Sequence, residues 1–213
     1  MHSMKTATAS PAKRDHIKAL ITLSLAITLF LGSSMADAAK CKYQKNELDS
    51  FTQEKIVWTK WTSFTPYGNQ VTHHGWLSAF SRDDAKLLVM KIVLVEHTSD
   101  QPRASYLDGR LIIPQDAKLL IHMADDSIVE LAAREQAVGS SRVIPPGEIT
   151  NRGTGYIVKT TAVINFELNA DTINTLMAQG TTDMTISARS RDHGFPFGKK
   201  PTDKFQFALG CIQ

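Results

Sequence analysis

Hydrophobic positions between residues 86 and 96 form the clearest core pattern of the chain, Lys86-Leu-Leu-Val-Met-Lys-Ile-Val-Leu-Val-Glu96. As a strand, this run puts Leu88, Met90, Ile92 and Leu94 on one face and Leu87, Val89, Val93 and Val95 on the other. Because both faces are apolar, we expect an interior strand that the rest of the protein covers on both sides. The run is too short for a membrane-spanning helix, which needs roughly 20 apolar residues, and Lys91 interrupts it.

Other segments carry the alternation, or the β-branched and aromatic residues, that are typical of strands. We expect strands at 56–64, 71–80, 118–123, 127–131, 156–168 and 183–189. The third and fourth of these flank Ala124-Asp125-Asp126, so they predict a hairpin with an acidic turn. Turn residues at 65–69 end the first strand, and the polar segment 42–54 predicts an extended or irregular start.

One helix is signalled between residues 169 and 180. Asn169 or Asp171 can cap its first turn, and Gly180 stands where a helix commonly ends. Apolar residues recur there at i, i+3 and i+4, namely Ile173, Leu176 and Met177.

The last segment, 203–211, has two interpretations. Its alternation favours a final strand, with the apolar positions at Phe205, Phe207, Leu209 and Cys211. A helix beginning near Pro201-Thr202-Asp203 is the alternative, because Phe205, Ala208 and Leu209 also share a helical face.

Between these elements we expect loops at 97–109 and 190–200 and a short apolar stretch at 110–113. The stretch 132–153 is too long for an ordinary connection, so it predicts a mobile excursion or a functional loop. Together the pattern predicts a mainly β domain, an antiparallel sandwich or flattened barrel with one short helix. An α+β arrangement is the alternative.

The N-terminus has the pattern of a secretory signal peptide. Basic residues precede a 13-residue apolar run, Ala19–Leu31, and Ala36-Asp37-Ala38 offers a cleavage site. A signal anchor that stays in place is the alternative, which the short run and the cleavage site disfavour.

Cleavage after Ala38 would remove residues 1–38 and leave a single domain of 175 residues, 39–213, with no stable membrane span. Four basic and two acidic residues leave with the signal peptide, so the formal net charge falls from +3 to +1. Nucleic acid and anionic membranes call for clustered Lys and Arg, so this balance favours neither as a partner. We expect a periplasmic or secreted protein with an unknown envelope or extracellular partner.

The mature chain has two cysteines, Cys41 and Cys211, each the third residue from an end. In an oxidising compartment such a pair predicts one disulfide that ties the termini together. Two buried free thiols are the alternative.

The C-terminal half, about 90 residues, runs through a hairpin with an acidic turn, a long strand, a short helix, a strand and a final Cys-Ile. The residues that carry this pattern are Leu168, Asp171, Ile173, Leu176, Met177, Gly180, Cys211 and Ile212. The order resembles small secreted proteins of Gram-negative bacteria. Those families have no assigned activity, so the resemblance supports the fold and leaves function open.

No motif in the sequence identifies catalysis. The five histidines of the mature chain lack the close spacing of metal ligands, and adjacent His73 and His74 point to opposite faces of a strand. There is no G-x-S-x-G elbow, and the paired carboxylates Asp83-Asp84 and Asp125-Asp126 lie in predicted turns. We therefore expect no metal, no cofactor and a non-catalytic domain rather than an enzyme.

The stretch 189–200 is the most suggestive for binding, because it combines cationic groups with aromatic rings in a glycine-containing loop. Such a combination can receive an acidic or ring-bearing ligand. The candidate contact residues are Arg191, His193, Phe195, Phe197 and Lys199. In the alternative interpretation, both phenylalanines pack on the core and the charges only solvate the loop.

Three tryptophans, Trp58, Trp61 and Trp76, are a second candidate, as a stacking platform for sugar. If 56–64 is one strand, Trp58 and Trp61 face opposite sides, so at least one of them packs in the core or on the sheet.

The sequence thus favours an exported non-catalytic binding or envelope-associated domain of unknown ligand. A small secreted hydrolase, with a site formed only in three dimensions, is the alternative, and a subunit of an envelope assembly is a third possibility. A pocket with two convergent titratable groups would favour the hydrolase. A filled core with an exposed aromatic or apolar patch would favour binding.

Overall fold

The computed structural model describes residues 41–64, 73–99, 111–146 and 155–213. The chain divides into two units, 1–41 and 42–213, and every helix and strand of the described residues belongs to the second. The predicted signal peptide at 1–38 lies outside the described residues, as do the predicted turn at 65–69 and most of the predicted loop at 97–109.

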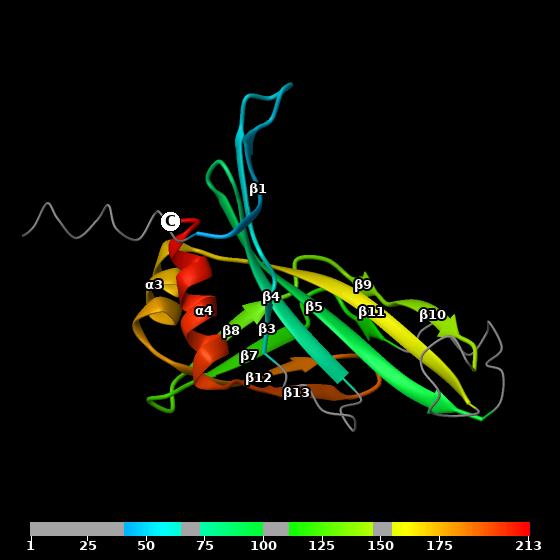
Figure 1. The fold of residues 1–213 in the computed structure, drawn as a ribbon. Coiled ribbons are helices and arrows are strands. Elements are labelled where there is room, and N and C mark those ends of the chain that lie inside the picture. Colours follow the sequence, from blue (N-terminus) through cyan, green and yellow to red (C-terminus); the bar gives the residue numbers. More distant parts are fainter. Residues whose placement is uncertain (1–40, 65–72, 100–110, 147–154) are drawn as a thin grey trace, which may run out of the picture. The chain divides into compact units, whose positions relative to one another are not determined.

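A seven-stranded antiparallel sheet is the largest element of residues 42–213 (Figure 1). Its strands are β1 (Tyr43–Leu48), β2 (Lys55–Thr59), β3 (Thr62–Ser63), β4 (His73–Arg82), β5 (Ala85–Thr98), β10 (Ser140–Ile144) and β11 (Tyr156–Glu167). They run in the order β1-β2-β4-β5-β11-β10, and β3 also pairs with β4. The apolar run at 86–96 is therefore an interior strand, as predicted, because β5 pairs with β4 on one side and with β11 on the other.

The other strands of the described residues form two smaller sheets. They are built from β6 (Ile112–Ile113), β7 (Lys118–Met123), β8 (Ile128–Ala132), β9 (Ala137–Val138), β12 (Thr181–Ser187) and β13 (Asp192–Pro196). One sheet has the order β13-β12-β7-β8, and the other pairs β6 with β9. The curled antiparallel sheets confirm the predicted mainly β fold.

The predicted hairpin with an acidic turn is confirmed as β7 and β8. In its turn, the Asp125 carboxylate accepts hydrogen bonds from the Ser127 N–H at 3.1 Å and the Ser127 hydroxyl at 2.6 Å. Asp126 has a φ of 66°, a left-handed conformation that aspartate tolerates better than most residues. The acidic residues therefore form the turn, as expected from their position.

The described residues contain two helices where the sequence predicted one. Helix α3 (Ala170–Ala178) begins as expected, because the Asn169 side chain accepts a hydrogen bond from the Thr172 N–H at 2.7 Å. The N-cap is thus Asn169 rather than Asp171. At the other end of the helix the C-cap is Gln179, and Gly180 follows it.

The prediction of a final strand at 203–211 is wrong. This segment belongs to helix α4 (Lys199–Gly210), whose buried residues are Thr202, Phe205, Ala208 and Leu209. Helical spacing buries these side chains together against the core, whereas Phe207 of the alternating pattern stays half-buried. Pro201 is tolerated because it lies in the first turn, where backbone N–H groups lack helical partners.

Two predicted loops contain strands. The stretch 132–153 holds β9 and β10, and β10 pairs with β11 at the edge of the large sheet. The stretch 190–200 holds β13, which pairs with β12 and is followed by α4. Both β10 and β13 are edge strands with exposed polar positions, so they lack the strong apolar signal of an interior strand.

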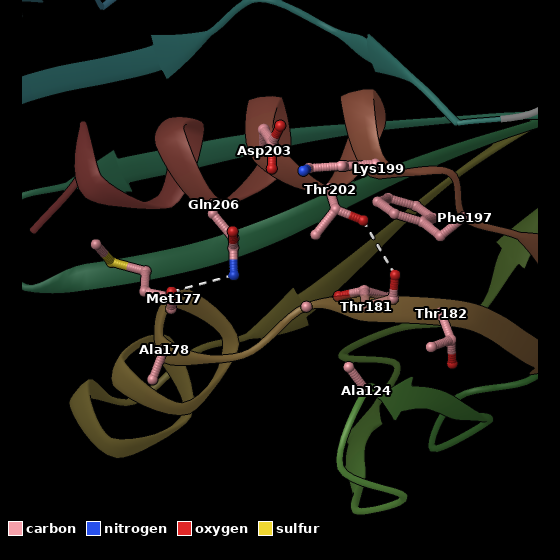
Figure 2. A pocket seen from close by; sticks show the side chains of 11 residues that line it. Ala124, Met177, Ala178, Thr181, Thr182, Phe197, Lys199, Thr202, Asp203 and Gln206 are labelled. Atoms are coloured by element: carbon pink, nitrogen blue, oxygen red, sulfur yellow. Dashed lines mark hydrogen bonds between the residues drawn. The ribbon is translucent and has the colours of Figure 1, made fainter.

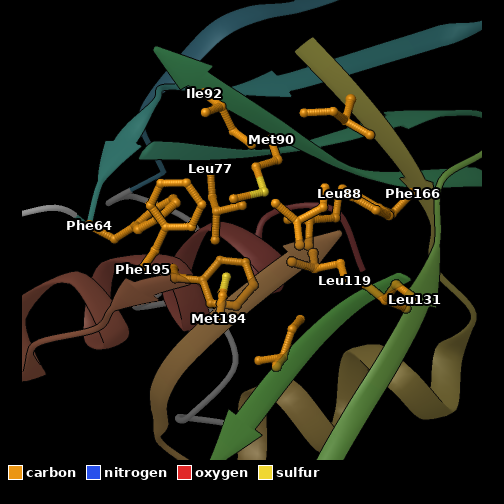
Figure 3. Packing of buried hydrophobic residues seen from close by; sticks show 14 of the residues in the cluster. Phe64, Leu77, Leu88, Met90, Ile92, Leu119, Leu131, Phe166, Met184 and Phe195 are labelled. Atoms are coloured by element: carbon orange, nitrogen blue, oxygen red, sulfur yellow. The ribbon is translucent and has the colours of Figure 1, made fainter. Parts of the chain in front are cut away.

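The hydrophobic core lies between one face of the large sheet and the four-stranded sheet (Figure 3). Leu88, Met90 and Ile92 of β5 are fully buried, and in Figure 3 Leu88 and Met90 point toward Leu119 of β7 and Met184 of β12. Burying an apolar side chain of this size stabilises the fold by about 1.5–3 kcal/mol. The buried residues of α4 join the same cluster, so the helix closes one side of the core.

Packing in this core is close enough to require a glycine at position 75 of β4. A side-chain carbon there would lie 2.2 Å from Cζ of Phe64. The Phe64 ring in turn contacts the rings of Phe195 and Phe197, at centroid distances of 5.3 and 5.0 Å. Because the Phe64 ring is held by these neighbours, it cannot move aside for a larger residue.

The opposite face of the large sheet is partly open to solvent. Leu87, Val93 and Val95 of β5 are half-buried there, and Val163 of β11 is 48% exposed. Val89 on this side is buried, so the expectation that both sides of the 86–96 strand are covered is met only in part. We call this side of the large sheet the outer face.

Cys41 and Cys211 are both disulfide-bonded, as the sequence predicted. A disulfide is compatible with an oxidising, exported location. Among the helices of the described segments, none has the length and apolar character needed to cross a membrane.

Candidate functional site

The five residues predicted to contact a ligand do not share one surface. His193, Phe195 and Phe197 are buried, with 3%, 1% and 8% of their surfaces exposed. Arg191 and Lys199 are exposed. Strand alternation in β13 turns His193 and Phe195 inward, so the phenylalanines pack on the core as in the alternative interpretation. A ligand-contact role for these five residues stays a prediction.

His193 packs beside His73 and Phe195. The His73 ring lies 6.3 Å from that of His193 and 5.2 Å from that of Phe195, and His73 Nε2 lies 3.0 Å from the Gly194 carbonyl oxygen. The His193 Nε2 is buried and has no hydrogen-bond partner among the described residues. Burial lowers the pKa of His193, and the charge of Arg191 acts in the same direction. The arrangement therefore favours a neutral packing histidine.

A cavity of about 510 Å³ lies beside α3, α4 and the start of β12 (Figure 2). Two of the predicted contact residues, Phe197 and Lys199, lie on its wall. Its ionisable groups are Lys199 and Asp203, which are both exposed and lie four residues apart on α4. Two of the five residues predicted to contact a ligand therefore lie together at this cavity.

The polar side chains Gln206 and Thr202 of this cavity hold the fold together. The Gln206 side-chain amide lies 3.2, 3.1 and 2.6 Å from the carbonyl oxygens of Leu176, Met177 and Gln179. The Thr202 hydroxyl donates to the Thr181 carbonyl at 3.0 Å (Figure 2). The Thr181 hydroxyl is buried and inaccessible, with no partner among the described residues. These groups are therefore poorly placed to bind a ligand.

A second cavity, of about 300 Å³, lies at the turn between β4 and β5 and is lined by Asp83 and Asp84. Asp83 has a φ of 47°, and its carboxylate accepts a hydrogen bond from the Lys55 N–H at 3.1 Å. Lys55 and Lys86 line the same cavity. Asp83 therefore has the turn role that the sequence indicated.

The three tryptophans lie on one side of the large sheet, contrary to the sequence expectation for Trp58 and Trp61. Residues 56–64 form two strands, β2 and β3, and the break at Lys60 and Trp61 changes which side the following residues face. The Trp58 and Trp61 rings meet edge to face at 6.3 Å, and Trp58 meets Phe80 at 6.1 Å. We call Trp58, Trp61, Trp76 and Phe80 the aromatic cluster.

The aromatic cluster surrounds a lysine. Lys91 Nζ lies 4.9 Å from the Trp61 ring centroid and 4.4 Å from that of Trp76. Residues directly opposite each other on paired strands point to the same side, and Lys91 is opposite Trp76. Partial burial lowers the pKa of Lys91 because it penalises the charged ammonium. Cation–π attraction to the two indole rings offsets part of that cost.

Three more basic side chains lie on the outer face. Register places His74 opposite Val93 on β4 and β5, Lys159 opposite Val95 on β11 and β5, and Arg142 opposite Lys159 on β10 and β11. Desolvation lowers the pKa of His74, and the nearby charges of His73 and Lys159 lower it further. The outer face therefore combines an aromatic cluster, half-buried aliphatic side chains and a group of cations.

Sequence reasoning singled out the tryptophans but missed Lys159 and Arg142 as parts of a site. Lys91 was visible as an interruption of one face of the apolar run, but the sequence predicted both faces to be covered. Lys159 and Arg142 join this face only through the pairing of β5, β11 and β10, which a single sequence does not specify.

The described residues contain no group of three or more His, Cys, Asp or Glu side chains that could hold a metal ion. Models of protein families, curated proteins and solved structures were compared with this chain, and none of them matches it.

Proposed function

We propose that this chain is an exported, non-catalytic binding domain that binds a saccharide through the outer face of the large sheet. The observation that carries the proposal is the aromatic cluster, in which three half-buried indole rings stand on a sheet face that is partly open to solvent. Aromatic side chains of this kind offer a large apolar surface together with a polar edge. They suit a ligand with apolar ring faces, such as a sugar.

Export is supported by the leader pattern at 1–38 and by the disulfide of Cys41 and Cys211. The resemblance of the C-terminal half to small secreted proteins of Gram-negative bacteria supports a place in the periplasm or outside the cell. Polysaccharides are major components of that bacterial envelope, so the compartment supplies ligands of the proposed kind.

The geometry of the aromatic cluster favours a local contact with one or two rings. The Trp58 ring stands at 69° to Trp61 and at 87° to Phe80, so the rings do not form a flat extended platform. A ring-shaped ligand would instead pack against individual indole faces and edges. The small secreted hydrolase, the alternative function, gains no specific support from the 510 Å³ and 300 Å³ cavities.

Intrinsic fluorescence tests this proposal directly, because all three tryptophans of the chain belong to the aromatic cluster. The exported protein is titrated with soluble polysaccharide fractions from a Gram-negative envelope. We expect tryptophan emission to shift to shorter wavelength and quenching by acrylamide to decrease. Both changes follow if a bound sugar displaces water from the indole rings.

Two variants separate the outer face from the α3–α4 cavity. Trp61→Ala should weaken saccharide binding by about tenfold or more, since it removes one indole from the cluster. Asp203→Ala changes the cavity wall and should leave binding unchanged. Thermal unfolding confirms that both variants are folded. Saccharide binding that leaves the emission unchanged, or that Asp203→Ala abolishes, would contradict the proposal.

A further inference from the structure

Three cations on the outer face have no anionic partner within the described part of the chain. Lys91, Lys159 and Arg142 form no ion pair there. Two carboxylates elsewhere on the large sheet pair with other cations. Glu167 pairs with Arg134 at 3.4 Å, and Glu47 pairs with Lys45 at 3.0 Å.

Two of these cations are placed against each other. Arg142 and Lys159 lie directly opposite on the antiparallel pair β10 and β11. Like charges in this position destabilise a sheet, and neither residue has a carboxylate partner among the described residues that compensates. A bound anion would remove this repulsion, so the pair is better suited to a liganded state than to the free protein.

The positive charge extends to the aromatic cluster. The charge of Lys159 contributes to the lowered pKa of His74, whose ring lies 6.0 Å from that of Trp76. Lys91 Nζ lies over both Trp61 and Trp76. A sugar ring packed on either indole would therefore bring its substituents close to a partly desolvated ammonium, where an anion is bound more strongly than in water.

From this arrangement we propose that the ligand of the outer face is an acidic saccharide, whose carboxylate or phosphate groups bind Lys91, Lys159 and Arg142. The inference rests on the proposed function, because it names the ligand class for the same face. The indole rings pack against the apolar faces of the sugar, and the three cations bind its acidic groups.

Other occupants fit the outer face less well. A second copy of the chain in a two-fold dimer would place this cationic face against itself, and like charges across an interface are repulsive. An anionic lipid surface binds juxtamembrane or helical clusters of four to eight Lys and Arg. Lys91, Lys159 and Arg142 instead lie along three strands of a sheet. Single-stranded nucleic acid also combines stacking with negative charge, so an oligonucleotide is included among the ligands to be tested.

The test compares two polymers with the same sugar rings, one charged and one neutral. Polygalacturonate carries a carboxylate on each sugar, and its fully methyl-esterified form has the same rings without the charge. Binding of each to the full exported protein is followed by tryptophan fluorescence. We expect the acidic polymer to bind about tenfold more tightly than the ester, and the difference to shrink as salt is raised.

Variants assign the preference to the cations. Lys91→Met keeps the hydrocarbon stem over the indole rings but removes the charge, and it should abolish most of the preference for the acidic polymer. Lys159→Met should also reduce the preference for the acidic polymer over its ester. Lys204 is an exposed lysine on α4, so Lys204→Met is the matched control. This variant should bind both polymers as the unmodified protein does.

The outcomes distinguish this inference from the proposed function. Equal binding of the acidic polymer and its ester would overturn the acidic ligand and leave saccharide binding intact. Failure of both polymers to bind would overturn both proposals. Equal binding of a single-stranded oligonucleotide, or of vesicles of anionic lipid, would overturn the saccharide as the preferred ligand. A concentration-dependent dimer that blocks the tryptophan response would assign the face to a second copy.

Discussion

Lys91 and His193 show how burial acts on single ionisable groups in this protein. Desolvation is the main cause of a lowered pKa in both, because each loses hydration that favours its charged form. The two differ in their surroundings. Lys91 reaches the outer face and has two indole rings around its ammonium, whereas His193 is 3% exposed and its Nε2 has no partner among the described residues.

His193 should make the protein less stable in acid. Because its folded pKa lies below the ordinary value of 6.5, the unfolded chain binds more protons in this range. The free energy of unfolding should therefore fall as pH drops through 6.5 toward the lowered folded value, and level off above 6.5. Interactions with Arg191 and His73 lower the pKa of His193 further, whereas the interaction with Asp192 raises it.

Urea unfolding at about pH 8 and about pH 5 measures this loss. His193→Gln cannot titrate, so its free energy of unfolding should fall less between the two conditions than that of the unmodified protein. His97→Gln changes an exposed histidine and should behave like the unmodified protein. An identical loss in His193→Gln and the unmodified protein would show that His193 does not contribute.

Helices α3 and α4 depend on each other through a polar contact at their ends. The carbonyl groups in the last turn of a helix have no partners within it. The Gln206 amide of α4 lies close to the carbonyl oxygens of Leu176 and Met177 in α3 and of Gln179, which directly follows α3. The other end of α3 is capped by Asn169. Both ends are thus satisfied by side chains, which explains how so short a helix is stable beside α4.

Removing the Gln206 amide should destabilise the protein. Gln206→Met keeps the length of the side chain but loses its donors, and we expect the free energy of unfolding to fall by about 1–2 kcal/mol. Gln206→Glu should cost more, since a negative charge would meet the negative end of the α3 dipole. Denaturant unfolding checks both variants. Gln213→Met removes an exposed hydrogen bond to Asn174 and should be nearly neutral.

The whole unit of residues 42–213 has one filled core and one large sheet face that stays partly open. A two-layer arrangement buries the inner faces of the sheets and leaves their outer faces to solvent. Here the outer face of the large sheet carries half-buried Leu87, Val93 and Val95 beside the aromatic cluster. These apolar side chains beside the aromatic cluster support the proposed binding face.

The disulfide should contribute strongly to the stability of the whole molecule. Cys41 and Cys211 enclose residues 42–210, and closing so long a loop is worth up to about 5 kcal/mol, less any strain. Reduction should lower the free energy of unfolding by an amount in that range. The variant with both Cys41→Ser and Cys211→Ser should show the same loss and no further response to reductant.

Alkylation of the non-reduced, denatured protein provides an independent measurement. It should label neither cysteine, whereas labelling after reduction should modify both. Two reactive thiols without reduction would contradict the bond and would remove the structural support for export.

Prediction from the sequence succeeded where one residue pattern had a single physical solution. The run from Leu87 to Val95 is apolar on both faces and became an interior strand. Asp125 and Asp126 between two apolar segments became a hairpin turn. Of the two capping residues that the sequence allowed, Asn169 is the one that caps α3. The segment at 203–211 fitted two periodicities, and the helix formed because it buries Phe205 and Leu209 together.

The candidate site was harder to predict, because it depends on register and on breaks in strands. Trp58 and Trp61 share a side only because the chain leaves the sheet at Lys60 and Trp61. Phe195 and Phe197 looked like loop residues but fill the space around Phe64, which the sequence cannot place beside them. Lys159 and Arg142 are separated in sequence and meet across β10 and β11.

The sequence by itself determined the β-rich class, the interior strand, the hairpin, helix α3 and the pairing of the only two cysteines, because each follows from local spacing or composition. Tertiary structure alone decided which face of the large sheet stays open and which side chains gather on it. The physical reason is that strand order and register are chosen by the packing of the whole core, and no short segment contains that information.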